Sequence, residues 1–285
     1  MRIRKLTRIT HGADTGTTAG HSPGRRIAAR LSSAVVGVVS LLMATTAVPS
    51  QAVFNGSPSV PQDYGWVVKV DMAYTQGFAS CTGSLIRPDT VVTAAHCIRY
   101  GGQAPLATSV TFHSGQNPGQ YSVAVTQAVP MPDYDSALIK DDIAMLTLQT
   151  SVTEAPIELA STEPPVGASV VVAGYGCTAD PFKSQDPCAA PSQLREISVA
   201  TVAAETCPDI AGAWQFCTYS KERSVNSGDS GGPVVWVEDG VRKLAGVTNA
   251  IELPPAASYL NMSASVAYEL DWLNSAAGTS APGTP

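Results

Sequence analysis

A glycine-rich stretch surrounds one serine of this chain, Ser230, in the string NSGDSGGP at Asn226–Pro233. A serine hydroxyl becomes a strong nucleophile only when a base takes its proton, and the oxyanion that then forms on the attacked carbonyl needs fixed donors. The backbone N–H groups of Gly228 and Ser230 can serve as those donors, since glycine at 228 allows conformations closed to other residues. The stretch is therefore a candidate for acyl-transfer chemistry. The alternative is an ordinary glycine-rich loop.

A histidine and an aspartate stand in contexts that suit the base and the acid of a triad. His96 follows the β-branched run Val91–Thr93 and precedes Cys97, so a strand end and a cysteine can fix its position. Asp142 opens the apolar run 143–146, which places an acid at the mouth of an expected strand. In a Ser-His-Asp triad the aspartate holds the imidazole tautomer and stabilises the imidazolium without taking the proton.

Three short strings together resemble the trypsin/chymotrypsin family of serine proteases: TAAHC at Thr93–Cys97, DIAML at Asp142–Leu146 and GDSGGP at Gly228–Pro233. Their order along the chain, His, Asp, Ser, distinguishes this family from subtilisins and α/β-hydrolases. The similarity extends from about Val53 to Asn274. It implies a serine endopeptidase in which His96 is the base, Asp142 orients it and Ser230 is the nucleophile.

The resemblance also implies an ion pair and a specificity pocket. The string at Val53–Gly56 resembles the family's mature N-terminus, whose free α-amino group pairs with the acid before the catalytic serine, here Asp229. The family residue six positions before that serine forms the pocket floor, and here it is Ser224, which implies a substrate preference other than Arg or Lys. Asn249 begins the strand expected beside the substrate. Asn226 stands where the family often has a cysteine that braces the pocket.

Short β-branched runs separated by turn residues predict an all-β fold with two sets of strands. The first set is Trp66–Met72, Gly83–Ile86, Thr90–Thr93, Val110–His113, Gln120–Thr126 and Ile143–Leu148; the second is Ser169–Gly174, Leu194–Val202, Phe216–Tyr219, Pro233–Val237, Val241–Thr248 and Tyr259–Met262. The family resemblance implies that each set forms an antiparallel six-stranded Greek-key β-barrel, with the active site between the two barrels.

The domain organisation follows from these strand sets. We expect a signal peptide and extension over 1–52, a first barrel over 53–165, a second barrel with a C-terminal helix over 166–275 and a disordered tail over 276–285. The helix is predicted over Ser263–Asn274, because Val266, Leu270 and Leu273 recur on one face and Ser263 suits an N-cap.

The first 52 residues predict secretion. Three arginines, Arg25, Arg26 and Arg30, precede an uncharged run of apolar or small residues over Leu31–Val48, and Ala52 ends a site with small residues where a signal peptidase cuts. A membrane anchor is the alternative, since the run approaches the lower length limit of a membrane span. The expected cleavage site coincides with the family-like N-terminus, so removal of the signal peptide is expected to create the free N-terminus of the enzyme.

The charge balance excludes two partner classes. Residues 1–52 hold seven of the 17 Lys and Arg residues and one of the 23 Asp and Glu residues, so the chain from Val53 onwards carries 10 basic and 22 acidic side chains, a formal net charge of −12. Nucleic acid and anionic membrane surfaces repel such a chain. The expected partners are protein or peptide substrates, and the oligomeric state stays open.

Six cysteines in a secreted chain predict three disulfides, although 15 pairings are possible. Their spacing favours Cys81–Cys97, Cys177–Cys188 and Cys207–Cys217. A zinc site is the alternative for cysteines near a histidine, but the sequence has no Cys-x-x-Cys or His-x-x-x-His spacing. We therefore expect no metal and no cofactor.

Two other functions and one neighbouring acid need to be weighed. An inactive homologue that serves as a binding module would be expected to have lost a triad residue, and this chain retains all three. An esterase is possible for any acyl-transfer site, but the His-Asp-Ser order favours peptide bonds. Asp141 precedes Asp142; because Asp142 adjoins the apolar run, Asp141 is expected to be a solvated charge.

Overall fold

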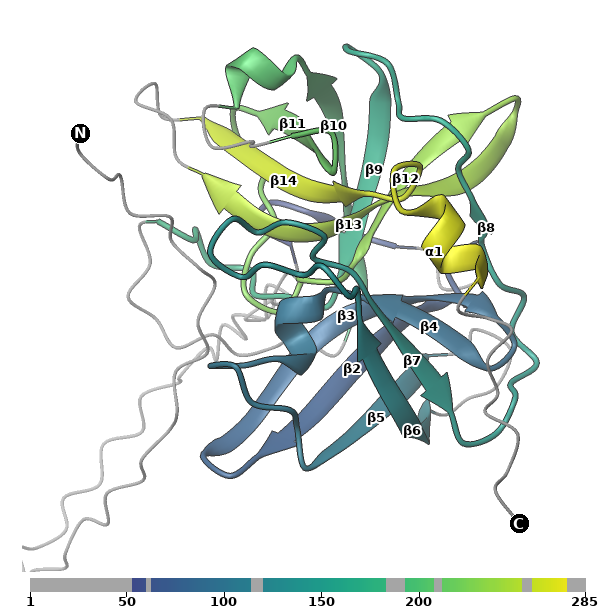
Figure 1. Ribbon diagram of the computed structural model, residues 1–285. Helices are drawn as coiled ribbons and strands as arrows, with labels where there is room; N and C mark the ends of the chain where they lie inside the picture. The colour runs from purple at the N-terminus through teal and green to yellow at the C-terminus, as the bar shows by residue number, and fades with distance from the viewer. Residues whose placement is uncertain are drawn as a thin grey trace, which may run out of the picture.

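Six strands close into a barrel in the first half of the chain. The computed structural model describes residues 53–59, 63–113, 120–182, 193–207, 212–252 and 258–275. Hydrogen bonding joins the strands of the first barrel in the order β2-β3-β4-β7-β6-β5, which forms the lower half of the molecule in Figure 1. Their bounds are β2 Val67–Tyr74, β3 Gly77–Arg87, β4 Thr90–Thr93, β5 Ala107–His113, β6 Gln120–Pro130 and β7 Ala144–Leu148.

Six further strands form the second barrel, which is the upper half in Figure 1. They pair in the order β10-β11-β14-β13-β12-β9, and the additional pairing of β10 with β9 closes the ring. Their bounds are β9 Ser169–Gly174, β10 Arg195–Val202, β11 Gln215–Ser220, β12 Pro233–Glu238, β13 Val241–Glu252 and β14 Tyr259–Ser265. The short strands β1 (Ser57–Pro58) and β8 (Glu158–Leu159) pair with β10 and β13. The predicted fold of two six-stranded antiparallel barrels is thus confirmed.

Alternation of side chains along the strands builds the core. In β2, Val68, Val70 and Met72 are buried while the residues between them are half-exposed, as expected for a strand with one face against a core. The apolar cluster of the first barrel continues to Val247 of β13 and to Leu273 near the C-terminus. The two barrels therefore share packed side chains where they meet.

The C-terminal helix is shorter than predicted. Helix α1 spans Leu270–Ser275, whereas the prediction began it at Ser263 with that serine as N-cap. That part of the prediction is wrong, because Ser263 lies within β14 and pairs with Phe216 on one side and Thr248 on the other. The spacing of the apolar residues does not distinguish a helix from a strand followed by a turn. Residues 263–265 are in a strand because β14 pairs with a neighbouring strand on each edge.

Two of the three predicted disulfides are confirmed. Cys81 and Cys97 are joined with an S–S distance of 2.03 Å, and Cys207 and Cys217 with 1.98 Å. The first joins β3 to the 3-10 helix η2 (Ala95–Ile98), and the second joins the end of the 3-10 helix η3 (Ala204–Thr206) to β11. Cys188 lies outside the described residues, so its pairing with Cys177 stays a prediction.

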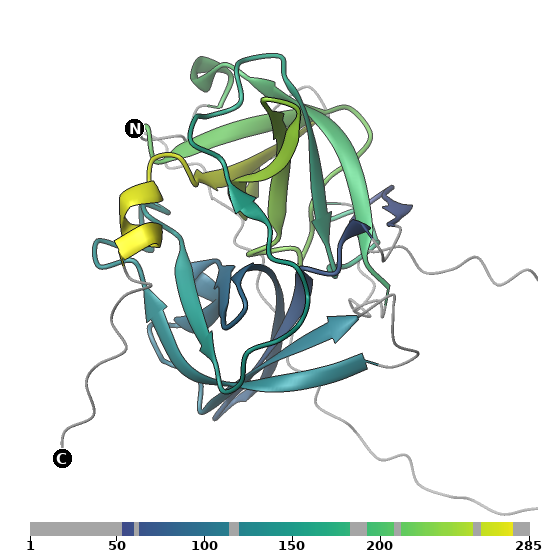
Figure 2. The ribbon, with the colours of Figure 1, turned by 90° about the vertical axis from the view of Figure 1, so that its right-hand side faces the viewer.

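The predicted signal peptide (1–52) and tail (276–285) also lie outside the described residues. Within the part of the chain that the structure describes, no helix is long and apolar enough to cross a membrane. Figure 2 shows the segment that carries β8 passing from the lower barrel to the upper one, with α1 on the outside of the molecule.

Candidate active site

His96 and Asp142 meet because two strands of the first barrel pair. His96 lies on η2 just after β4, and Asp142 lies just before β7; β4 and β7 pair with Thr93 opposite Ala144. The distance from His96 Nδ1 to Asp142 Oδ2 is 2.7 Å, and the backbone N–H of His96 donates to Asp142 Oδ1 at 2.8 Å. A carboxylate only accepts, so Nδ1 carries a proton, and Nε2 of a neutral His96 is left as an acceptor.

Ser230 lies on the turn before β12, against the segment that carries His96. Its carbonyl accepts the N–H of Thr82 at 2.8 Å, and its carbonyl oxygen lies 3.8 Å from Cys97 Sγ. The next residue, Gly231, has φ +81°, and a Cβ there would clash with Thr93 and with the backbone N of Ala94. Only glycine permits this approach. The second barrel thus places Ser230 beside the histidine segment of the first.

Among the described residues, the backbone around Ser230 carries two unpaired donors. Gly228 has φ +94°, a conformation that favours glycine, and a Cβ there would press on Gly176. Within the described part of the chain, no hydrogen-bond acceptor is paired with the N–H of Gly228 or of Ser230. These two N–H groups are therefore available to a substrate oxygen.

Asp229 is fully buried beside that loop. Its Oδ1 accepts the N–H of Gly176 and its Oδ2 the N–H of Asn226, each at 2.8 Å. Burial raises the pKa of Asp229 to about 7, although both backbone donors act in the opposite direction. Val53, the predicted partner, is fully buried in the apolar cluster of the second barrel. In the full-length chain its nitrogen is in a peptide bond, so the ion pair stays a prediction for the processed form.

The predicted pocket residue Ser224 lies on a neutral, closed network. It has no exposed surface, and its Oγ lies 3.0 Å from Asn261 Oδ1 and 2.9 Å from the carbonyl of Val225. Asn261 is also fully buried and accepts the N–H of Val225 at 3.1 Å. The sequence analysis did not identify Asn261, which is 37 positions from Ser224. The sequence feature that could have indicated it is a polar amide at an inward-facing position of a predicted strand.

Asn249 lies on β13 as expected, at an irregularity in the pairing between Thr248 and Ala250. Its side chain is 5% exposed, and within the described residues neither its amide oxygen nor its amide nitrogen has a partner. The irregularity is a bulge, the kind of feature that redirects a side chain beside a functional site.

The expectation that Asp141 is solvated is wrong. Asp141 is 3% exposed, and its Oδ2 lies 3.3 Å from Lys140 Nζ. Its backbone has φ +50°, so the chain bends there and carries the side chain inwards, toward Glu269. Glu269 is equally buried, and burial, reinforced by the neighbouring Asp141, raises the pKa of Glu269 to about 8. Glu269 therefore favours its protonated form beside Asp141.

We expect this pair to make stability depend on pH. The folded state keeps the Glu269 proton to a higher pH than the unfolded state does. The free energy of unfolding therefore falls as the pH rises from 4.5 to about 8. Glu269→Gln, whose amide can donate to Asp141, should remove this fall of up to about 5 kcal/mol. Urea unfolding at pH 5, 7 and 9 measures it, with the exposed helix residue Asp271→Asn as control. An unchanged pH dependence in Glu269→Gln contradicts the raised pKa of Glu269 as its cause.

A metal site is not supported in the described part of the chain. The side-chain nitrogen or sulfur atoms of Cys81, His96 and Cys97 lie within 4.8 Å of one another. The two sulfurs are bonded to each other, however, and a metal needs the free thiolate.

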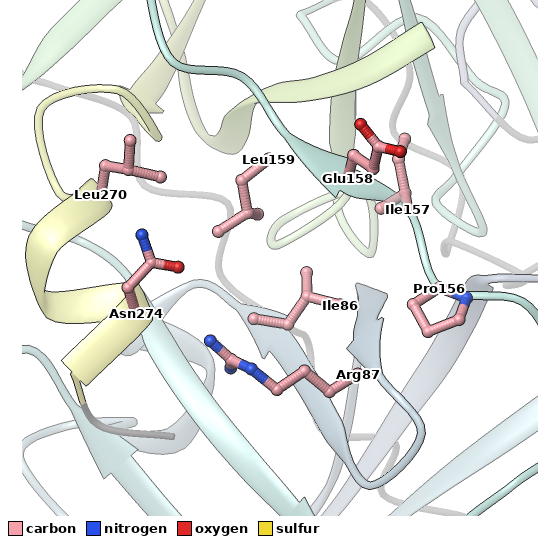
Figure 3. A pocket seen from close by; sticks show the side chains of 8 residues that line it. All are labelled: Ile86, Arg87, Pro156, Ile157, Glu158, Leu159, Leu270 and Asn274. Atoms are coloured by element: carbon pink, nitrogen blue, oxygen red, sulfur yellow. The ribbon is translucent and has the colours of Figure 1, made fainter. Parts of the chain in front are cut away.

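A cavity of about 410 Å³ opens between β3, the β8 segment and α1 (Figure 3). It is lined by Ile86, Arg87, Pro156, Ile157, Glu158, Leu159, Leu270 and Asn274. None of the predicted site residues lines it.

Comparisons with known proteins match most of this chain to one family. A family model described as Trypsin matches residues 53–273. Trypsin theta of Drosophila melanogaster is 34% identical over 180 residues, which cover 58% of this chain and 66% of that protein. Trypsin eta of Drosophila erecta is 29% identical over 254 residues, which cover 81% of this chain and 92% of that protein.

Two further similarities are to a human protein and to a solved structure. Kallikrein-4 of Homo sapiens is 28% identical over 194 residues, which cover 64% of this chain and 72% of that protein. A solved structure titled "Structure of GrC" superposes with a TM-score of 0.67 at 23% identity, covering 79% of this chain and 99% of that one. At that identity the structural likeness shows the fold alone.

Proposed function

The chain belongs to the trypsin family of serine proteases, and from that premise we propose that it is a secreted endopeptidase that uses His96, Asp142 and Ser230 as its triad. The observation that carries the proposal is the pair of hydrogen bonds from His96 to the buried carboxylate of Asp142. They occupy Nδ1 and leave Nε2 as the acceptor on the side of the ring away from the acid, as a general base requires.

The proposed reaction is acyl transfer in two halves. His96 takes the proton of Ser230 as its Oγ attacks the substrate carbonyl, and the N–H groups of Gly228 and Ser230 bind the oxyanion. His96 then protonates the leaving amine, which leaves an acyl-enzyme on Ser230. In the second half, water attacks the acyl group with His96 again as the base, and Ser230 is released with its proton restored.

The proposed substrates lack a basic side chain at the cleavage site. The floor residue Ser224 and its partner Asn261 are neutral and bonded to each other. Because neither of them offers a carboxylate, the desolvation of an arginine or lysine side chain is not compensated by this floor. We therefore expect cleavage after uncharged residues.

Processing at Val53 is proposed to complete the site. Val53 has φ +54°, which is strained for a β-branched residue, and this dihedral angle exists only while the bond to Ala52 is intact. Cleavage removes the strain and creates an ammonium group that can pair with the buried Asp229. Since Ala52 also ends the predicted signal peptide, we propose that signal removal and activation are one step.

The test of function is a substrate panel on the secreted, purified protein. We expect hydrolysis of internal peptide bonds in a peptide library, with little cleavage after Arg or Lys, and reaction with a serine-directed fluorophosphonate. Cleavage of small esters alone, with every peptide intact, would favour an esterase. Absence of reaction with both substrates and probe would favour an inactive homologue.

N-terminal sequencing of the active protein tests the processing step. We expect the first residue to be Val53. Active enzyme that begins at another residue would contradict the proposal that signal removal activates the protein.

A further inference from the structure

Thr82 of β3 is a first-barrel residue whose polar groups bind the second barrel. It is fully buried. Its N–H donates to the carbonyl of Ser230 at 2.8 Å, its Oγ1 donates to the carbonyl of Gly228 at 2.8 Å, and the N–H of Tyr175 donates to that same Oγ1 at 3.0 Å. Two of these hydrogen bonds thus hold the loop around the proposed nucleophile, and the third holds the segment that follows β9.

The direction of these bonds is fixed by chemistry. A hydroxyl has one hydrogen to donate, and carbonyl groups only accept. The N–H of Tyr175 must therefore use the lone pair of Thr82 Oγ1, and the hydroxyl hydrogen must go to Gly228. A residue without a hydroxyl would leave a carbonyl and an N–H unpaired in a buried place, which is costly.

The hydroxyl holds the loop that presents the two oxyanion donors. The Gly228 carbonyl belongs to the peptide that leads to Asp229, between the N–H groups of Gly228 and Ser230. Tyr175 directly precedes Gly176, whose N–H binds the Asp229 carboxyl group at 2.8 Å. Thr82 therefore restrains the loop from the Gly228 side and, through the Tyr175 segment, from the Asp229 side.

The same strand also fixes the histidine. Cys81, next to Thr82, is bonded to Cys97, next to His96. In addition, Thr93 Oγ1 donates to the carbonyl of Thr82 at 2.8 Å. β3 is thus a common support for the proposed base on one side and for the oxyanion loop on the other.

We propose that Thr82 is a positioning residue, whose hydroxyl aims the N–H groups of Gly228 and Ser230 at the developing oxyanion. This inference rests on the proposed function. Because the oxyanion exists only in and near the transition state, loss of the hydroxyl lowers kcat more than it changes KM.

The experiment compares Thr82→Val, which keeps the branched shape without the hydroxyl, with Thr82→Ser, which keeps the hydroxyl. We expect kcat for a peptide substrate to fall about 10- to 100-fold in Thr82→Val, with KM within about threefold of the wild type. Thr82→Ser should retain kcat within about threefold. A peptide boronic acid, which forms a tetrahedral adduct on serine, should lose affinity in Thr82→Val by a factor similar to that for kcat.

Thr201→Val is the matched control. Thr201 is also a buried threonine: its Oγ1 donates to the carbonyl of Pro165 at 2.6 Å, lies 3.4 Å from the carbonyl of Ala168 and accepts the N–H of Ala168 at 3.0 Å. It lies on β10, and its partners are not part of the proposed site. We expect a lower melting temperature and an unchanged kcat in Thr201→Val.

Two results overturn the inference: a folded Thr82→Val enzyme with kcat within about twofold of the wild type, or equal losses in Thr82→Ser and Thr82→Val. If Thr82→Val does not fold, Thr82→Ala replaces it in the same comparison. Failure of the proposed function is distinct, since the wild-type protein itself would then neither cleave peptides nor react with a fluorophosphonate.

Discussion

Replacing Ser230 with alanine lowers kcat for peptide hydrolysis by about 10⁵- to 10⁶-fold, because the nucleophile of the acyl-enzyme is lost while binding and the oxyanion donors remain. KM changes little in comparison. Burst kinetics and fluorophosphonate labelling of the purified protein measure the effect, and labelling disappears completely in Ser230→Ala.

Ser198→Ala is the control for Ser230→Ala. Ser198 is an exposed serine on β10, so its replacement should leave both the rate and the labelling unchanged. If Ser230→Ala were still labelled at the wild-type rate, another residue would be the nucleophile, and the proposed mechanism would be contradicted.

The second large effect is expected at Asp142. An asparagine there can present its amide N–H₂ to His96 Nδ1, which then must accept, so the imidazole proton moves to Nε2. That tautomer cannot take the proton of Ser230, and kcat at neutral pH falls about 10⁴-fold. Initial rates with the best peptide from the library measure this loss.

The neighbouring aspartate provides a stringent control. Asp141→Asn makes the same chemical change one residue earlier, where the side chain faces Lys140 and Glu269 rather than His96. We expect kcat to stay within about tenfold of the wild type, since the histidine tautomer is unaffected. Equal losses in the two variants would mean that Asp142 acts through loop structure rather than through His96.

The amino-acid sequence determined the family and the strands of this protein. Strings around His96, Asp142 and Ser230 are local and specific, and the period-two alternation of β-branched residues depends on no distant contact. The Cys81–Cys97 and Cys207–Cys217 pairs could be predicted for the same reason, since each closes a short loop.

Only the tertiary structure determined the features that depend on contacts between residues far apart in the chain. Ser263 continues a strand because β11 and β13 pair with it on both edges. Asp141 is buried because the C-terminal turn brings Glu269 against it. The role of Thr82 lies in hydrogen bonds to residues 93 and 146 positions away. A sequence pattern reports the periodicity of one segment, whereas burial and hydrogen-bond partners are set where two segments meet.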